Sequence, residues 1–150
     1  MNLECIKQRL APCGLHCGKC FAFKDGEIAR LSAELDRALG NFGPYAERFV
    51  SVLEAPVFLQ YPAFAEFLRY LSAGGCGGCR KEKCKIAKCC NVRLCSEEKG
   101  VDFCFQCQEF PCDSSGFDEN LHARHITINM RMKEVGVEEY YNEIRDTQRY

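Results

Sequence analysis

Apolar residues recur at helical spacing between residues 25 and 73, and the pattern predicts three consecutive helices. Asp25 can cap the first helix, Pro44 suits the first turn of the second, and the third begins near Pro62. Stop signals follow each helix: Gly40 with Asn41, then Pro56, then Gly74 with Gly75. The apolar stripes consist of Ile28, Leu31, Leu35, Leu39, Phe49, Val52, Leu53, Phe64, Phe67, Leu68 and Leu71. We expect these stripes to face the core.

Residues 118–150 return to a helical pattern. Asp118 is a suitable N-cap, and Gly136 separates a longer helix from a short last one. The apolar positions are Leu121, His125, Ile128, Met132 and Val135 in the longer helix, and Val137, Tyr140, Tyr141 and Ile144 in the short one. The strand candidates, residues 57–59 and 101–103, are short.

Residues 74–117 hold nine of the 13 cysteines, together with glycines and lysines, and show little periodicity. A metal must organise this stretch, because it has few large apolar side chains to bury and no regular backbone hydrogen bonding in prospect. A chain of 150 residues has no room for a second full-size domain. We therefore expect one mainly α domain over residues 1–150, with a cysteine trio and helices in 1–73, an irregular metal-organised segment in 74–117, and C-terminal helices in 118–150.

The use of cysteine depends on the cellular compartment. The first ten residues mix charges and lack the apolar region of a signal peptide, and no stretch approaches 18 apolar residues. We therefore expect a cytoplasmic protein without membrane contact. In a reducing compartment, closely spaced cysteines bind metal more often than they form disulfides.

The net charge of −1 favours no polyanionic partner, but its distribution is uneven. Residues 80–93 contain six basic residues and one acidic residue, a local charge of +5. We interpret this stretch as countercharge for metal-bound thiolates. A nucleic-acid-binding knuckle, with Phe103 and Phe105 stacking on bases, is the alternative.

The first cysteine motif is C-x2-C-x4-C-x4-C, formed by Cys76, Cys79, Cys84 and Cys89. This is the spacing of a zinc knuckle in which cysteine replaces the usual histidine. C-x2-C turns two sulfurs toward one point, and four thiolates complete a tetrahedral shell around Zn²⁺. The nearby lysines and arginine lower the pKa values of such thiols.

The second motif repeats C-x2-C-x4-C with Cys104, Cys107 and Cys112, so a fourth ligand must come from upstream. Cys95 is the first candidate and Cys90 the second. The adjacent residues Cys89 and Cys90 do not easily serve one ion, because consecutive side chains diverge, but they can serve two neighbouring ions.

The third motif is C-x3-C-x2-C, formed by Cys13, Cys17 and Cys20. It matches the [4Fe–4S] trio of radical S-adenosylmethionine enzymes. Those enzymes also need βα units, and residues 25–73 supply helices without strands. The simpler interpretation is a third zinc site completed by His16, Cys5 or a spare cysteine.

Other side chains add little to this chemistry. His122 and His125 are three residues apart on a predicted helix and can share a metal, but His125 lies on the apolar stripe, where a core imidazole is the commoner role. No nucleophile motif, phosphate-binding glycine loop or dinucleotide motif is present, so nothing nominates a catalytic residue, and enzyme activity is not the expectation.

Four segments resemble successive signatures of one known family: residues 11–20 (APCGLHCGKC), 75–79 (GCGGC), 90–100 (CNVRLCSEEKG) and 103–112 (FCFQCQEFPC). The family consists of small cysteine-rich bacterial and archaeal proteins of unknown function that are held to bind zinc. The resemblance spans about residues 11–136 and implies no activity. It implies metal-binding roles for Cys13, Cys17, Cys20, Cys76, Cys79, Cys90, Cys95, Cys104, Cys107 and Cys112. In this pattern Cys90 and Cys95 take the place of Cys84 and Cys89.

The sequence therefore predicts a zinc protein whose two to three Zn²⁺ ions are structural, because four cysteines close each site and leave no position for substrate. Zinc sites of this kind contribute about 10–16 kcal/mol each to folding. An iron–sulfur redox or radical protein with a [4Fe–4S] cluster is the second alternative.

Overall fold

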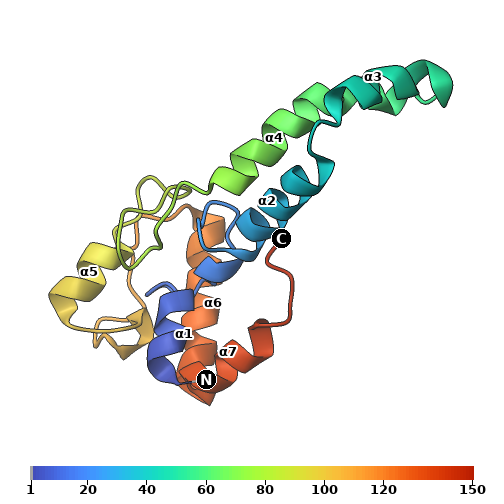
Figure 1. Cartoon of the computed structure of the whole chain (residues 1–150). Helices are drawn as coiled ribbons and strands as arrows, with labels where there is room; N and C mark the ends of the chain where they lie inside the picture. Colours follow the sequence, from blue (N-terminus) through green and yellow to red (C-terminus); the bar gives the residue numbers. More distant parts are fainter. Residues whose placement is uncertain (1) are drawn as a thin grey trace.

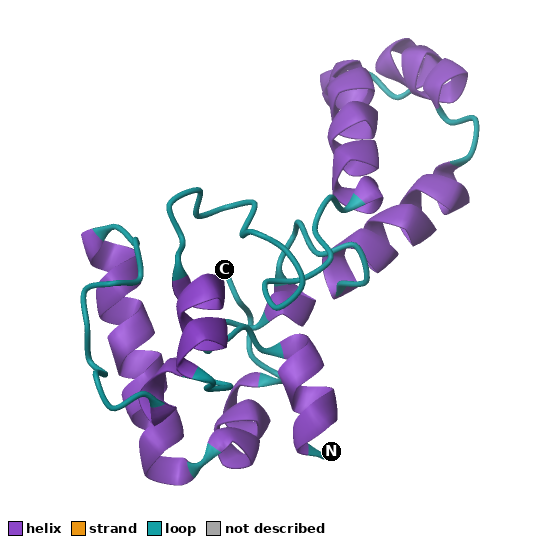
Figure 2. Cartoon of the chain, turned by 90° about the vertical axis from the view of Figure 1, so that its left-hand side faces the viewer, coloured by secondary structure: helices purple, strands orange, loops and turns teal. Residues whose placement is uncertain are grey.

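The computed structural model describes residues 2–150 and confirms the mainly helical prediction. Within this range it has seven α-helices, three 3-10 turns and no strand (Figure 2). The α-helices are α1 (Leu3–Arg9), α2 (Glu27–Leu39), α3 (Gly43–Val52), α4 (Tyr61–Ala73), α5 (Val92–Lys99), α6 (Glu119–Val135) and α7 (Val137–Ile144). The 3-10 turns are η1 (Cys17–Lys19), η2 (Pro56–Gln60) and η3 (Cys104–Gln106). None of the helices described is long and apolar enough to cross a membrane.

The molecule has two parts, which we call the head (residues 2–24 and 74–150) and the arm (residues 25–73). In the arm, α2 leads away from the head, α3 and η2 form the tip, and α4 returns beside α2 (Figure 1). The two ends of the arm meet at the head, where the amide of Cys76 donates to the carbonyl of Ala22 (2.8 Å) and the amide of Lys24 donates to the carbonyl of Cys76 (3.0 Å). The arm is therefore a long helical hairpin that leaves and re-enters the head at one place.

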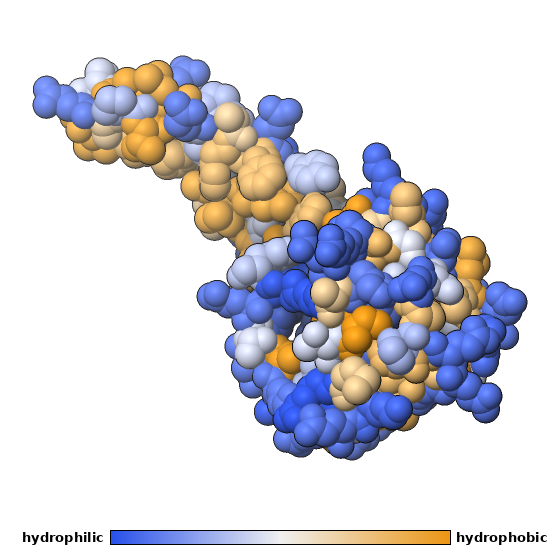
Figure 3. Space-filling model, turned by 180° about the vertical axis from the view of Figure 1, so that it is seen from behind, coloured by the Kyte–Doolittle hydropathy of each residue, from blue (hydrophilic) through white to orange (hydrophobic). Residues whose placement is uncertain are grey.

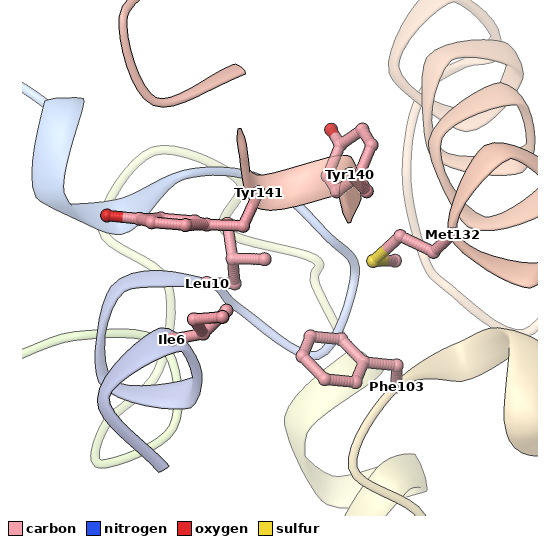
Figure 4. Close-up of a cluster of buried hydrophobic side chains, with 6 residues drawn as sticks. All are labelled: Ile6, Leu10, Phe103, Met132, Tyr140 and Tyr141. Carbon is pink, nitrogen blue, oxygen red and sulfur yellow. The ribbon is translucent and has the colours of Figure 1, made fainter. Parts of the chain in front are cut away.

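The head is held by a core in which α1, α6 and α7 meet the segment before η3. Six buried side chains form this core: Ile6, Leu10, Phe103, Met132, Tyr140 and Tyr141 (Figure 4). Phe103 and Met132 have no exposed surface. Three of the six belong to the stripes predicted for residues 118–150, and the carboxylate of Asp118 caps α6 by accepting from the amide of Leu121 (3.0 Å). The prediction for this part of the chain is confirmed.

Two short helices were not predicted. Helix α1 has seven residues and buries Ile6 alone, with its first turn capped by Asn2. Helix α5 has eight residues, buries Val92 and Ser96, and ends at Gly100 in the left-handed conformation. Neither helix shows enough apolar residues for a periodic signal. Of the two candidate strands, residues 57–59 lie in η2 and residues 101–103 form no strand.

The prediction that the arm stripes face a core is wrong for most of their residues. The buried residues of the arm helices are mostly small: Ala29 and Ser32 in α2, Ala46 in α3, and Ala65 with Leu68 in α4. Large stripe residues are exposed instead: Leu31, Leu35, Val52, Leu53, Phe64 and Phe67. The reason is architectural, because a two-helix hairpin buries one side of each helix and has no third layer to cover the remainder (Figure 3).

Candidate metal centre

All 13 cysteines are free thiols, and 11 of them are buried or half-buried in the head, whereas Cys5 and Cys89 are exposed at its surface. They gather because the loop after α1, the turn at residues 76–79, helix α5 and the η3 segment meet on one side of the head. Two groups and one pair result, which we name the Cys104 group, the Cys17 group and the Cys76 pair. Cysteines distant in sequence thus share one interior.

The Cys104 group consists of Cys95, Cys104, Cys107 and Cys112. Cys95 lies on α5, while Cys104 and Cys107 bracket η3, where the amide of Cys107 donates to the carbonyl of Cys104 (3.0 Å). Burial raises the pKa of Cys104 to about 12, with further contributions from the other three thiols and from Cys90. Burial, then Cys112 and Cys107, also raise the pKa of Cys95. The four sulfurs are therefore close enough for their charges to interact.

The Cys17 group centres on Cys17, Cys79 and Cys84. The thiol of Cys79 shares hydrogen bonds with both of the others, which lowers the pKa of Cys17 to about 7 and that of Cys84 to about 5, while the pKa of Cys79 is raised. Burial, then the thiols of Cys17, Cys90 and Cys104, raise the pKa of Cys13, and burial together with Cys84 raises that of Cys90. Cys13, Cys17, Cys79, Cys90 and Cys104 pack with the buried apolar side chains of Ala11 and Val92. The Cys17 group therefore adjoins the Cys104 group through this cluster, of which Cys84 is not a member.

The Cys76 pair is Cys76 with Cys20. Burial raises the pKa of Cys76, and Cys20 and Cys17 are among the thiols that add to the effect. The amide of Gly78 donates to the Cys76 sulfur (3.4 Å). Because Cys17 also acts on Cys76, this pair adjoins the Cys17 group.

The four cysteines of the knuckle spacing are not brought together. Cys79 and Cys84 belong to the Cys17 group, Cys76 is beside Cys20, and Cys89 is exposed. The cause is the backbone pairing at the base of the arm, which holds Cys76 against residues 22–24 and turns Cys79 toward Cys17. A local spacing cannot reveal such a long-range contact.

Asn129 positions two cysteine motifs at once. Its side chain is fully buried, donates to the carbonyl of Cys13 (2.9 Å) and accepts from the amide of Phe105 (3.1 Å). Gly14 allows this approach, because its φ is +85° and a Cβ there would lie 2.2 Å from Ile128. The sequence contains a signal that was missed, since Asn129 is a polar residue four positions after His125 on the same predicted stripe.

Arg80, which follows Cys79, is the second positioning residue that sequence analysis missed. Its guanidinium donates to the carbonyls of Lys7 (2.8 Å), Leu10 (2.9 Å) and Asp102 (2.9 Å) and lies over the ring of Phe103, 4.8 Å from its centre. Three carbonyls from two segments thereby hold the Cys79 turn in place. Arg80 therefore faces inward, and the basic stretch presents one cation fewer to an external partner.

The histidines have separate roles. His125 is buried beside the carbonyl of Cys13 (3.4 Å) and Asn129 (3.1 Å), so it is the core imidazole that its stripe position indicated. His122 contacts the hydroxyl of Ser115 (3.1 Å). His16 is buried against Tyr141, and burial together with nearby cations lowers its pKa to about 4. Among residues 2–150 its Nδ1 atom has no hydrogen-bond partner.

A cavity of about 770 Å³ opens beside Cys17 and Cys79. Its walls come from α1, η1, the start of α2, the turn at residues 77–81 and α7, and they include Lys7, Lys19 and Lys81. The cavity gives solvent and small solutes access to one side of the Cys17 group.

No set of three or more histidine, cysteine or carboxylate side chains among residues 2–150 already stands in the arrangement of a metal site. The chemistry of the donors nonetheless fits a thiophilic ion, because both groups supply at least four free, partly buried thiols. A bound ion would have to draw these side chains together by rotation about their Cα–Cβ bonds.

Comparison with known proteins gives one match. A family model described as a protein of unknown function (DUF3795) matches residues 9–116, which include 12 of the 13 cysteines. No curated protein and no solved structure matches the chain. The match agrees with the expected membership of an uncharacterised family, and it covers both thiol groups together with the whole arm.

Proposed function

Since the chain belongs to the family of proteins of unknown function DUF3795, we propose from its own geometry that it is a zinc-binding protein with two structural sites, each closed by cysteines. The observation that carries the proposal is the Cys104 group. Four thiols, one from α5 and three from the η3 segment, lie close enough in the head to raise the pKa values of Cys95 and Cys104, although at least 75 residues separate them from the N-terminal motif.

Clustering of thiols in a half-buried site disfavours thiolates, in line with the raised pKa values of Cys95 and Cys104. A divalent thiophilic ion reverses the balance, because it binds the thiolates and releases their protons. Four cysteines and tetrahedral geometry are the usual composition of a structural zinc site. Zinc would thus link α5 to the η3 segment.

The second site is the Cys17 group. It offers five thiols, Cys13, Cys17, Cys79, Cys84 and Cys90, of which four complete a tetrahedral shell. Four thiolates around Zn²⁺ leave a net charge of −2, and Arg80 and Arg149 are the nearby cations that lower the pKa of Cys17. This site would tie residues 13–17 to residues 79–90.

Metal analysis of the full chain, purified without added metal, tests the proposal. We expect about two zinc ions per chain, about one in Cys107→Ser, and two in Cys5→Ser, because Cys5 is exposed and outside both groups. Stoichiometric iron and sulfide, with the visible absorption of an iron–sulfur cluster after anaerobic preparation, would overturn the zinc assignment. So would a metal-free protein that is fully folded.

A further inference from the structure

We propose that the arm is a dimerisation element that packs face to face with the arm of a second copy of this chain, forming a four-helix bundle from two α2–α4 hairpins. The proposal goes beyond zinc binding and does not depend on it, since the arm contains no cysteine.

The first support is that the hairpin buries mostly small residues and leaves large apolar residues exposed. Helices α2 and α4 pack against each other, and the residues buried on them are Ala29, Ser32, Ala65 and Leu68. The larger residues Leu31 (48% exposed), Leu35 (44%), Phe64 (44%) and Phe67 (59%) remain in contact with solvent. A helix pair that placed its small side chains inside and its large ones in water would forgo most of its hydrophobic stabilisation, unless another layer covered the large ones.

The second support is that these large residues share one face. At 3.6 residues per turn, Leu31 and Leu35 lie roughly a quarter to a third of a turn from the line through Ala29 and Ser32. Phe64 and Phe67 are displaced in the same rotational sense from the line through Ala65 and Leu68. In an antiparallel pair of helices, residues that are rotated away from the contact line by the same angle and in the same direction, each viewed along its own helix, lie on the same side of the hairpin. The exposed apolar residues therefore form a single surface along both helices, which we call the arm face.

The third support is area. Ten of the 15 large hydrophobic residues that are exposed in the described chain lie between residues 31 and 70. Four of the ten, Leu31, Leu35, Phe64 and Phe67, lie on the arm face, and five others lie at the tip: Tyr45, Val52, Leu53, Val57 and Leu59. A large aromatic side chain carries roughly 150–250 Å² of surface, so the four half-exposed side chains of the arm face leave on the order of 400 Å². A stable interface buries about 800 Å² on each partner, so the interface has to extend from the arm face onto the exposed residues of the tip.

The composition of the arm indicates a copy of itself rather than a highly charged partner. Between residues 27 and 73 there are four arginines, six acidic residues and no lysine, although the chain has nine lysines elsewhere. Protein interfaces are enriched in aromatic residues and depleted in lysine, and the arm shares both features. The charges are mixed and nearly balanced, so neither a polyanion nor a strongly basic protein is selected. Two identical faces of this kind can pair about a two-fold axis without like-charge repulsion.

The opposite side of the hairpin is polar and suits the solvent-facing side of such a bundle. Arg37 and Arg69 lie on that side by the same helical geometry, displaced from the contact lines in the reverse sense. The tip has its own aromatic cluster, in which the rings of Phe42 and Tyr61 are 5.1 Å apart and those of Phe49 and Phe58 are 5.4 Å apart, but Val57 at the tip is 70% exposed. The arm thus has one polar side, and its exposed apolar residues lie on the arm face and at the tip.

Sedimentation velocity and light scattering of the full chain, from micromolar to millimolar concentration, test the proposal. We expect a reversible monomer–dimer equilibrium. Leu35→Glu and Phe67→Glu should each raise the dimer dissociation constant by about tenfold or more, because each would bury a carboxylate in the apolar interface. Met130→Glu on α6 is the matched control: Met130 is 50% exposed in the head, and this variant should dimerise as the parent does.

Circular dichroism separates loss of the interface from loss of the fold, since both arm variants alter half-exposed side chains and should keep the helix content of the parent. Amide hydrogen exchange in residues 27–39 and 61–73 should slow as the concentration rises. A chain that stays monomeric throughout, or a dimer that Leu35→Glu and Phe67→Glu leave intact, would overturn the proposal. Zinc content plays no part in either readout, so failure here leaves the proposed function untouched.

Discussion

The side-chain amide of Asn129 donates to the carbonyl of Cys13 across a separation of 116 residues, at a distance of 2.9 Å. The oxygen of the same amide accepts from Phe105, between Cys104 and Cys107. Helix α6 therefore fixes the N-terminal cysteine motif and the η3 motif with a single buried residue. The relative placement of the two thiol groups depends on this contact.

Asn129→Ala should destabilise the head. The change leaves the carbonyl of Cys13 and the amide of Phe105 without these partners in a buried site, at a cost of about 1–3 kcal/mol for each unsatisfied group. Denaturant unfolding of the metal-loaded protein measures the loss. Asn142→Ala on the exposed side of α7 is the control and should unfold as the parent does. Equal stability of Asn129→Ala and Asn142→Ala would contradict the role given to Asn129.

Cys84→Ser and Cys89→Ser distinguish the knuckle spacing from the grouping in the structure. If the local spacing C-x2-C-x4-C-x4-C defined the site, both variants would lose zinc. We expect Cys84→Ser to weaken zinc binding at the Cys17 group and Cys89→Ser to retain the full complement, because Cys84 hydrogen-bonds to Cys79 while Cys89 is exposed. Zinc per chain after dialysis against a weak chelator is the measurement. A loss of zinc in Cys89→Ser would favour the knuckle.

Removal of metal by a strong chelator should affect the two parts of the molecule unequally. Amides of residues 76–112 should exchange faster, because the loops there are held mainly through the thiol groups. Amides of α2 and α4 should be unchanged, because their packing involves no cysteine. Hydrogen exchange read by mass spectrometry follows both regions in one sample. Equally faster amide exchange in the head and in the arm would contradict this prediction, because it would mean that metal binding also stabilises the arm.

The alkaline limit of stability should depend in part on Tyr140. Burial raises the pKa of Tyr140 from its usual 10 to about 12, so the unfolded chain releases this proton at lower pH than the folded one. The stabilising contribution is complete below pH 10 and declines as the pH rises toward 12, by at most about 1.4 kcal/mol per pH unit. Tyr140→Phe lacks this titration. The difference in unfolding free energy between parent and variant should therefore shift across that window, and a constant difference would contradict the assignment.

Sequence patterns predicted the elements that repeat over several turns. The stripes of α6 and α7 were correct because Met132, Tyr140 and Tyr141 meet a core made by the head itself. The stripes of α2 and α4 predicted the helices but not their surroundings, since periodicity shows that Leu35 and Phe67 share a face and not what covers it. Helix α5 was missed because eight residues with two buried positions give no periodic signal.

The thiol groups were partly predictable. Cys104, Cys107 and Cys112 repeat a short spacing, and Cys95 was the first candidate for the fourth member; these four are the residues of the Cys104 group. The Cys17 group was predicted only in part: the N-terminal motif was expected to take a further ligand such as a spare cysteine, but the spacing does not show that Cys79, 62 residues from Cys17, lies beside it. Arg80 was interpreted as countercharge for the thiols, which agrees with its lowering of the pKa of Cys17, but only its three carbonyl partners reveal its inward position.

The hydrogen bonds that join Lys24 and Ala22 to Cys76 allow the arm to differ in length without a change in the head. They place the departure and return points of the hairpin side by side, so the connection between them needs no particular length. A shorter loop would close the same gap at little entropic cost, and a longer hairpin would leave the thiols undisturbed. The segment inserted between Lys24 and Cys76 can therefore be replaced by another one, while the cysteines of the head keep their positions.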